Sequence, residues 1–152
     1  MTIRPATRSD VPRIVALLAD DALGAIRESP GDLGPYEAAF DAVAADPAQL
    51  LVVATTGDGE GDGEVVGTLQ LTFIPGLARR GALRAQVEAV RVASSARGAG
   101  LGETLLRWAV QESRRRGAAL VQLTSDAARP DAHRFYERLG FTATHVGFKL
   151  AL

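Results

Sequence analysis

The chain has no cysteine, a single lysine and no apolar run long enough to span a bilayer. Without cysteine it has no disulfide, no thiolate metal ligand and no thiol nucleophile. Its two histidines, His133 and His145, lack metal-ligand spacing, so we predict no metal site. The segment Met1-Thr2-Ile3-Arg4-Pro5 lacks the apolar core of a signal peptide, which predicts a soluble, cytoplasmic protein without a membrane partner.

An excess of positive charge is also lacking. The formal net charge is −1 at pH 7, and no lysine-rich tail is present, so the sequence predicts no nucleic-acid partner. A chain of 152 residues is long enough to bury about 68–70% of its unfolded surface. With no internal repeat and no long linker, residues 1–152 are expected to form a single domain.

Hydrophobic periodicity and turn residues predict the order of elements. Helices are expected from Ser9-Asp10 through Leu18, over 36–45, from Leu101 to Gly117 and over 130–139. Strands are expected over 2–6, 50–55, 64–73, 83–92 and 119–124, with one or two closing strands in 141–152. The prediction is an α/β (α+β) fold with a mixed central sheet of six to seven strands and about four helices.

The most informative segment is a strand that breaks into a glycine-rich loop and restarts as a helix, over residues 90–106. Gly98, Gly100 and Gly102 let a ligand approach the backbone closely, beside Arg97. The following helix start leaves about four N–H groups without intrahelical partners, at the positive end of the helix dipole. Together these features suit a pyrophosphate, although a glycine-rich turn that binds nothing has the same pattern.

Three other glycine-loop interpretations fit poorly. A Walker A loop needs Gly-Lys followed by Ser or Thr, and the only lysine is Lys149. A dinucleotide loop would have its third glycine where Glu103 stands. The acidic, glycine-rich loop over 57–63 does not match an EF-hand, because Leu69 falls at the twelfth position counted from Asp58.

Two motifs of this chain resemble motifs of the GNAT superfamily of acyl-CoA-dependent N-acetyltransferases. The first is the loop with Arg97, Gly100 and Gly102, and the second is the Tyr136-x-x-x-Gly140-Phe141 ending of the last predicted helix. The resemblance covers nearly the whole chain and includes the order of the elements. It implies the acyl-CoA N-acyltransferase fold, acetyl-CoA as co-substrate and an amine acceptor. Families that look like this one often form homodimers, so a homodimer is a further expectation.

The resemblance also implies positions for the acetyl-CoA site. Backbone groups of Val90, Arg91 and Val92 would hydrogen-bond the pantetheine arm, as an added strand would. The pyrophosphate would be held by the loop and helix start, namely Arg97, Gly98, Ala99, Gly100, Leu101, Gly102, Glu103 and Thr104. Arg129 stands where the family often has an asparagine, so the pantetheine contact is altered. Its side chain either meets a phosphate of CoA or points to solvent.

Acetyl transfer requires a neutral amine, which costs roughly 4–5 kcal/mol for a lysine-like amine at pH 7. Glu88 is the acid of the fourth predicted strand, and alternation would place it on the face of Gln86 and Val90. Partial burial would raise its pKa and make it a candidate general base. Alternatively, Glu88 pairs with Arg84 or Arg91, or only binds a cationic substrate.

The departing CoA thiolate needs a proton donor. The resemblance places Tyr136 near the thioester sulfur, and a phenol with a reference pKa of about 10 is protonated at pH 7. Tyr136 is therefore a candidate general acid or hydrogen-bond donor to the sulfur, with core packing as the alternative. Asp20, Asp21 and Glu28 could bind a cationic acceptor or simply form a solvated helix end.

The predicted function is direct acetyl transfer from acetyl-CoA to a primary amine, without a covalent enzyme intermediate. The alternative is a non-catalytic module that binds or senses acyl-CoA. Acceptor choice would come from the irregular segments 23–36 and 74–82, which carry no diagnostic motif.

Overall fold

The computed structural model describes residues 1–20, 24–57 and 63–152. Asp21 and the interior of the 57–63 loop, including Asp58, lie outside these ranges. The chain divides into two compact units, Met1–Gln122 and Leu123–Leu152, which are described separately below. The prediction that residues 1–152 form one domain stays a prediction.

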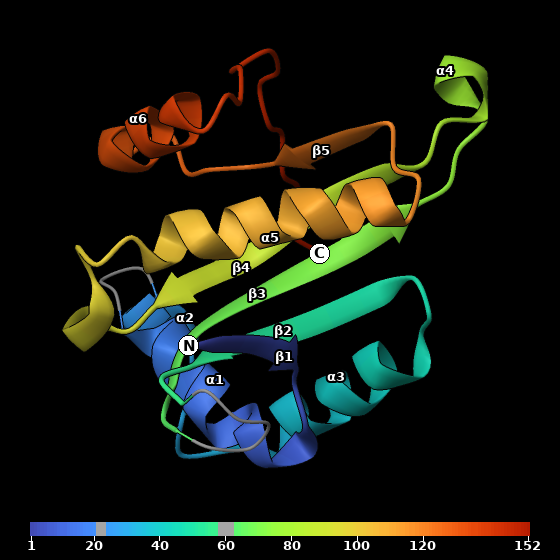
Figure 1. The fold of residues 1–152 in the computed structure, drawn as a ribbon. Helices are drawn as coiled ribbons and strands as arrows, with labels where there is room; N and C mark the ends of the chain where they lie inside the picture. The colour runs from blue at the N-terminus through green and yellow to red at the C-terminus, as the bar shows by residue number, and fades with distance from the viewer. Residues whose placement is uncertain (21–23, 58–62) are drawn as a thin grey trace. The chain divides into compact units, whose positions relative to one another are not determined.

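One sheet organises the larger unit, with its strands in the order β1-β2-β3-β4-β5 (Figure 1). Its strands are β1 (Thr2–Pro5), β2 (Gln49–Thr55), β3 (Val65–Ile74), β4 (Arg84–Val92) and β5 (Leu120–Leu123). The pairs β1/β2, β2/β3 and β3/β4 are all antiparallel. The strand bounds agree with the predicted ranges to within two residues.

The helices are more numerous than predicted. They are α1 (Val11–Ala19), α2 (Gly24–Arg27), α3 (Gly34–Ala45), α4 (Ala78–Gly81), α5 (Leu101–Arg115) and α6 (Pro130–Arg138), with 3₁₀ turns at η1 (Arg8–Asp10) and η2 (Ser94–Ala96). The additional helices α2 and α4 are single turns, too short to produce a helical hydrophobic period. Within α4, Arg79 and Arg80 have left-handed backbone conformations.

The predicted count of six to seven strands is wrong for the described residues, which form five. The closing strands expected in 141–152 are not formed, and residues 142–152 are exposed. Val146, Phe148 and Leu150 alternate as a strand would, but all three are at least 80% exposed. Alternation indicates the shape of a strand, whereas a sheet also requires a hydrogen-bonded neighbour.

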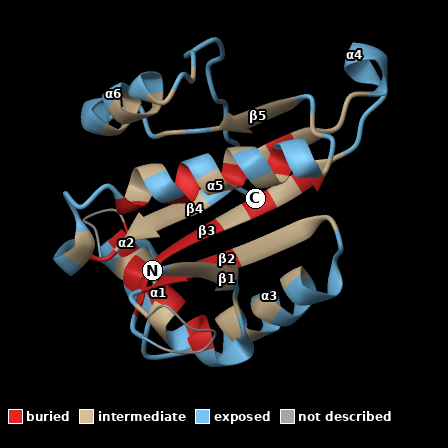
Figure 2. Cartoon of the chain, in the orientation of Figure 1, coloured by how far each residue is buried: buried red, intermediate tan, exposed pale blue. Residues whose placement is uncertain are grey.

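The core is centred on β3 (Figure 2). Leu69 and Leu71 are fully buried and pair across the sheet with Val52 on β2 and Val87 on β4. Helix α5 covers this face, because a Cβ added at Gly67 would lie 3.0 Å from Leu105 Cδ1. Glycine at this position therefore allows the helix to pack closely on the strand.

The observed buried faces of the helices differ in part from those that helical spacing predicts. The predicted inner positions are Val11, Ile14, Val15 and Leu18 in the first helix, Phe40, Val43 and Ala44 in the second, and Leu101, Leu105, Trp108 and Ala109 in the long helix. In α1, Leu17 is buried and Leu18 only half-buried. In α5, Leu101, Leu105 and Ala109 are buried as predicted, but Trp108 is only half-buried and Leu106 is buried in addition. Helix α3 has no fully buried residue, and its predicted inner position Ala44 is exposed.

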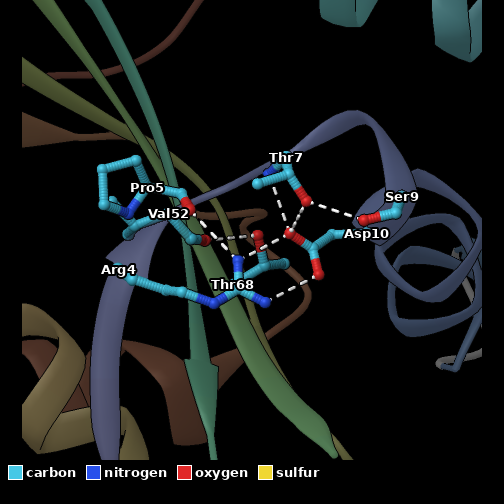
Figure 3. Close-up of polar contacts among 7 residues, drawn as sticks. All are labelled: Arg4, Pro5, Thr7, Ser9, Asp10, Val52 and Thr68. Atoms are coloured by element: carbon cyan, nitrogen blue, oxygen red, sulfur yellow. Dashed lines mark hydrogen bonds and ion pairs between the residues drawn. The ribbon is translucent and has the colours of Figure 1, made fainter. Parts of the chain in front are cut away.

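A buried ion pair joins β1 to the start of α1 (Figure 3). Arg4 Nη1 and Nη2 donate to the two carboxylate oxygens of Asp10 at 2.7 and 2.9 Å. The same carboxylate accepts the Thr7 N–H at 2.7 Å and the Thr7 hydroxyl at 2.9 Å. Hydrogen bonds from Arg4 and Thr7 lower the pKa of Asp10 to about 2, although burial opposes the shift.

Candidate active site

Strand β4 contains a β-bulge in the segment predicted to bind the co-substrate. Gln70 pairs with Glu88 and Thr68 pairs with Arg91, so Leu69 faces two residues, Ala89 and Val90. Ala89 has a left-handed φ of 52°. The extra residue reverses the alternation, which brings Arg91 to the face of Glu88 and moves Val90 to the other. The predicted shared face of Glu88 and Val90 is therefore wrong.

Beyond the bulge, backbone groups of β4 face away from β3. The Ala93 N–H donates to Val66 O on β3 at 2.8 Å, so by alternation the polar groups of Val92 face the opposite edge. Two arginine side chains reach carbonyls here: Arg91 Nη1 donates to Val90 O at 2.9 Å and Arg97 Nε to Val92 O at 3.3 Å. An extended ligand that pairs with this edge would therefore share these two carbonyls with the arginines or displace them.

The glycine loop, residues 97–102, leads from η2 into α5. Gly98 and Gly100 have φ values of 83° and 77°, which L side chains rarely adopt. A Cβ added at either position would meet nothing within 4 Å. Backbone conformation, rather than internal packing, therefore requires glycine at both positions, and the space beside them is open.

Helix α5 begins directly after this loop. The Thr104 N–H donates to Gly100 O at 3.0 Å, so the N–H groups of Leu101, Gly102 and Glu103 precede the intrahelical series. These groups lie at the positive end of a 15-residue helix. The predicted succession of strand, loop and helix is observed. Its role as a binding site for an anionic ligand stays a prediction.

Asp20, at the C-terminal end of α1, connects that helix to the loop. Its carboxylate accepts the Ser94 N–H at 3.1 Å and Arg97 Nη2 at 3.0 Å. Arg97 Nη2 also donates to Asp20 O at 3.0 Å. Asp20 therefore positions the glycine loop. The sequence did not predict this role, because Asp20 and Arg97 are 77 positions apart along the chain.

Glu88 lies on β4 in the larger unit, one residue before the bulge. Its side chain is exposed, so the expected partial burial is wrong. Within the described ranges it forms no salt bridge, and the pairing with Arg84 considered above is not found. Its cross-strand neighbour is Gln70. Glu88 is thus accessible to a cationic group.

Tyr136 lies in the smaller unit, on the last turn of α6, where a Schellman motif ends the helix. The Gly140 N–H donates to Glu137 O at 2.9 Å and the Phe141 N–H to Tyr136 O at 3.1 Å, with Gly140 at a φ of 90°. The Tyr136 ring lies 6.1 Å from Phe141 and 5.4 Å from Phe135. The Tyr-x-x-x-Gly-Phe spacing is therefore a helix-ending motif that also holds the tyrosine ring.

Arg129 immediately precedes α6, and its carbonyl accepts the His133 N–H at 3.2 Å. Its side chain is exposed.

Across the described ranges, no group of three or more histidine or acidic residues could hold a metal ion. In the same ranges, no helix is both long and apolar enough to cross a membrane.

The chain thus combines a five-stranded sheet in the described residues with a strand-loop-helix unit at β4 and α5. The family model of the GNAT acetyltransferases matches residues 12–141. The chain therefore belongs to the GNAT family and is an acetyltransferase enzyme. Members of this family use acetyl-CoA as co-substrate.

Relatives with described activities support this assignment. An aminoalkylphosphonate N-acetyltransferase of Salmonella typhimurium is 31% identical over 150 residues, covering 99% of this chain and 90% of the relative. A glucosamine 6-phosphate N-acetyltransferase of Trypanosoma brucei brucei is 37% identical over 91 residues, or 59% of each chain.

Solved structures share the fold over the whole chain. A Bacillus halodurans protein described as a transcriptional regulator has a TM-score of 0.92 and 45% identity, with 99% of each chain covered. A putative acetyltransferase from Agrobacterium tumefaciens has a TM-score of 0.82 and 28% identity over both complete chains.

Proposed function

We propose that this enzyme transfers the acetyl group of acetyl-CoA to the primary amine of a small molecule that carries a phosphonate or phosphate group. The observation that carries the donor assignment is the open glycine loop, with its left-handed glycines ahead of the α5 N-terminus. The acceptor class is supported by the two relatives, whose named acceptors combine an amine with a phosphonate or phosphate.

In this proposal, the segment from Arg97 to Thr104 binds the pyrophosphate of CoA, chiefly through the N–H groups of Leu101, Gly102 and Glu103 that precede the intrahelical series. The outer edge of β4 at Val90 and Val92 pairs with the pantetheine arm. Arg129 is a further candidate for contact with a CoA phosphate. A homodimer stays a prediction.

The reaction needs one proton acceptor and one proton donor. Glu88, directly or through water, takes a proton from the ammonium so that the neutral nitrogen can attack the thioester carbonyl. The C–N bond forms and the C–S bond breaks. Tyr136 donates a proton to the leaving CoA sulfur, and no covalent enzyme intermediate is formed.

The test measures thiol release from acetyl-CoA with a panel of primary amines. We expect turnover with the wild-type chain and a loss of roughly 100-fold in kcat for Tyr136→Phe, because the ring remains but the proton donor is removed. A preserved acetyl-CoA-dependent rise in Tm would show that the variant still folds and binds. Unchanged turnover in Tyr136→Phe would remove Tyr136 from the chemistry.

Turnover also decides between the enzyme and the acyl-CoA-sensing alternative. Stabilisation by acetyl-CoA without thiol release to any amine in the panel would contradict the proposed reaction. Glu88→Gln tests the base, because the amide keeps the size of the side chain and cannot accept the proton. We expect a roughly 100-fold loss of kcat/KM in this variant.

A further inference from the structure

The face of the sheet that carries Glu88 is polar where the opposite face is apolar. Along β4, Ala85 and Val87 are buried on the α5 side, whereas Arg84, Gln86 and Glu88 occupy the other side. Their cross-strand partners on β3 are Ile74, Thr72 and Gln70. Arg84 and Gln86 are half-buried, and Glu88 is exposed.

Hydrogen bonds fix the orientation of two glutamine amides on this polar face. Gln70 Nε2 donates to Gln49 Oε1 at 2.9 Å, and Thr72 Oγ1 donates to the same oxygen at 2.8 Å. Gln122 Nε2 donates to Gln86 Oε1 at 2.8 Å. The Gln70 oxygen and the Gln86 NH₂ group have no hydrogen-bond partner within the described part of the chain.

The two amides therefore present opposite polarities along the strand. Near Glu88, Gln70 offers a carbonyl oxygen, and an oxygen beside a carboxylate suits an ammonium group. Near Arg84, Gln86 offers N–H donors, and these beside a guanidinium suit an oxyanion. Arg84 has no ion pair among the residues that the structure describes.

The spacing of the two ends limits the size of the ligand. Four residues along a strand separate the Cα atoms of Arg84 and Glu88 by ~13 Å. The long, flexible arginine side chain can shorten this span to that of a small molecule. A molecule with an amine at one end and an oxyanion at the other therefore matches both charge and length.

We infer that Arg84 and Gln86 form the subsite for the anionic end of the acceptor, and that Gln70 and Glu88 hold its amine. This inference rests on the proposed function and assigns its acceptor specificity to four side chains of β3 and β4. A phosphonate and a phosphate ester present the same oxyanion chemistry, so both should bind there. Gln49 and Gln122 act as positioning residues that orient the two amides.

The test compares 2-aminoethylphosphonate with 2-aminoethanol, an amine without the anionic group. The measured quantity is kcat/KM for 2-aminoethylphosphonate divided by kcat/KM for 2-aminoethanol. In Arg84→Gln we expect this ratio to fall at least tenfold, mainly through KM for the phosphonate, because a charge-assisted contact is lost. Arg84→Lys should recover part of the preference, since the charge remains.

A matched control separates a specific contact from the general field of the protein. Arg114 is an exposed arginine in the last turn of α5, outside the polar face, and Arg114→Gln should keep the ratio within about twofold of wild type. An equal fall in both variants, or no fall in Arg84→Gln, would overturn the inference. It would also be overturned if the wild type did not prefer the phosphonate, while acetyl transfer itself would stand.

A binding measurement covers the case in which neither amine is acetylated and the proposed reaction fails. The Tm of the chain is then measured with and without 2-aminoethylphosphonate at millimolar concentration. A rise in wild type that is lost in Arg84→Gln and kept in Arg114→Gln would support the subsite on its own. The absence of any rise would show an ordinary solvated sheet face and overturn the inference.

Discussion

At the scale of single residues, buried charge and left-handed backbone conformations determine which side chains are replaceable. Asp10 is 7% exposed and accepts hydrogen bonds from Arg4 and Thr7. Removing one partner of such a pair leaves an unpaired buried charge, which costs more than the pair itself contributes. The ion pair fixes the start of α1 against β1.

This ion pair should make stability depend on pH. The pKa of Asp10 falls from an ordinary 3.8 to about 2, so its contribution is complete above pH 3.8 and is lost as pH falls towards 2. At 1.36 kcal/mol per pKa unit, the contribution is about 2 kcal/mol at pH 7. We expect Asp10→Asn to lower the free energy of unfolding by at least this amount at pH 7.

Urea unfolding between pH 7 and pH 2.5 measures this dependence. The difference in the free energy of unfolding between wild type and Asp10→Asn should shrink as the pH falls below 3.8, because the wild-type Asp10 carboxylate is then protonated. Glu137→Gln, at an exposed acid of α6, is the control and should change stability little at any pH. A difference that stays constant with pH would contradict the role assigned to the Asp10 carboxylate.

At the scale of elements, the ends of helices and strands position the candidate catalytic groups. The bulge at Ala89 redirects β4 directly after Glu88, and the Asp20 contacts hold the glycine loop against the end of α1. Helix α6 ends in a Schellman motif that packs Phe141 against Tyr136. In each case, a local backbone feature sets the place of a side chain predicted to act on the substrates.

The Schellman motif gives a prediction with a close control. Gly140 has a φ of 90° and open space around it, so Gly140→Ala costs only backbone strain, roughly 1–2 kcal/mol. Gly147 has equal space but no left-handed φ, and Gly147→Ala should be nearly neutral. Urea unfolding of the two variants measures the difference, and equal effects would show that the φ value carries no cost.

At the scale of the whole molecule, ligand binding should appear as added stability of the folded chain. Acetyl-CoA at 100 times its dissociation constant adds about 2.7 kcal/mol, or roughly 5–10 °C in Tm for a chain of this length. We expect this rise in wild type and its loss in Gly100→Val. A side chain there strains the loop and enters the space next to the free N–H groups.

Gly76→Val is the matched control, because Gly76 also has open space but no left-handed φ and lies outside the glycine loop. Its acetyl-CoA-dependent rise in Tm should equal that of wild type. Without a rise in wild type at saturating acetyl-CoA, the donor assignment would be wrong. An unaffected rise in Gly100→Val would place acetyl-CoA away from this loop.

Features that depend on local chemistry were predictable from the amino-acid sequence. Strand alternation, the glycines of the 97–102 loop and the Tyr136-x-x-x-Gly140-Phe141 spacing predicted the central strands, the helix start and the family, because each depends on neighbours along the chain. The number of strands was overestimated because pairing in a sheet depends on a neighbouring strand, which local alternation does not reveal. The 141–152 segment has the alternation of a strand but no ladder partner in the structure.

Features that depend on residues far apart in the sequence became visible in the folded chain. The tertiary structure revealed the contact between Asp20 and Arg97 and the pairing of Glu88 with Gln70, both of which join separate elements. It also located the bulge, because one extra residue is visible only against the register of β3. A periodic sequence pattern assumes unbroken alternation, so a single inserted residue reversed the predicted face of every position beyond Ala89.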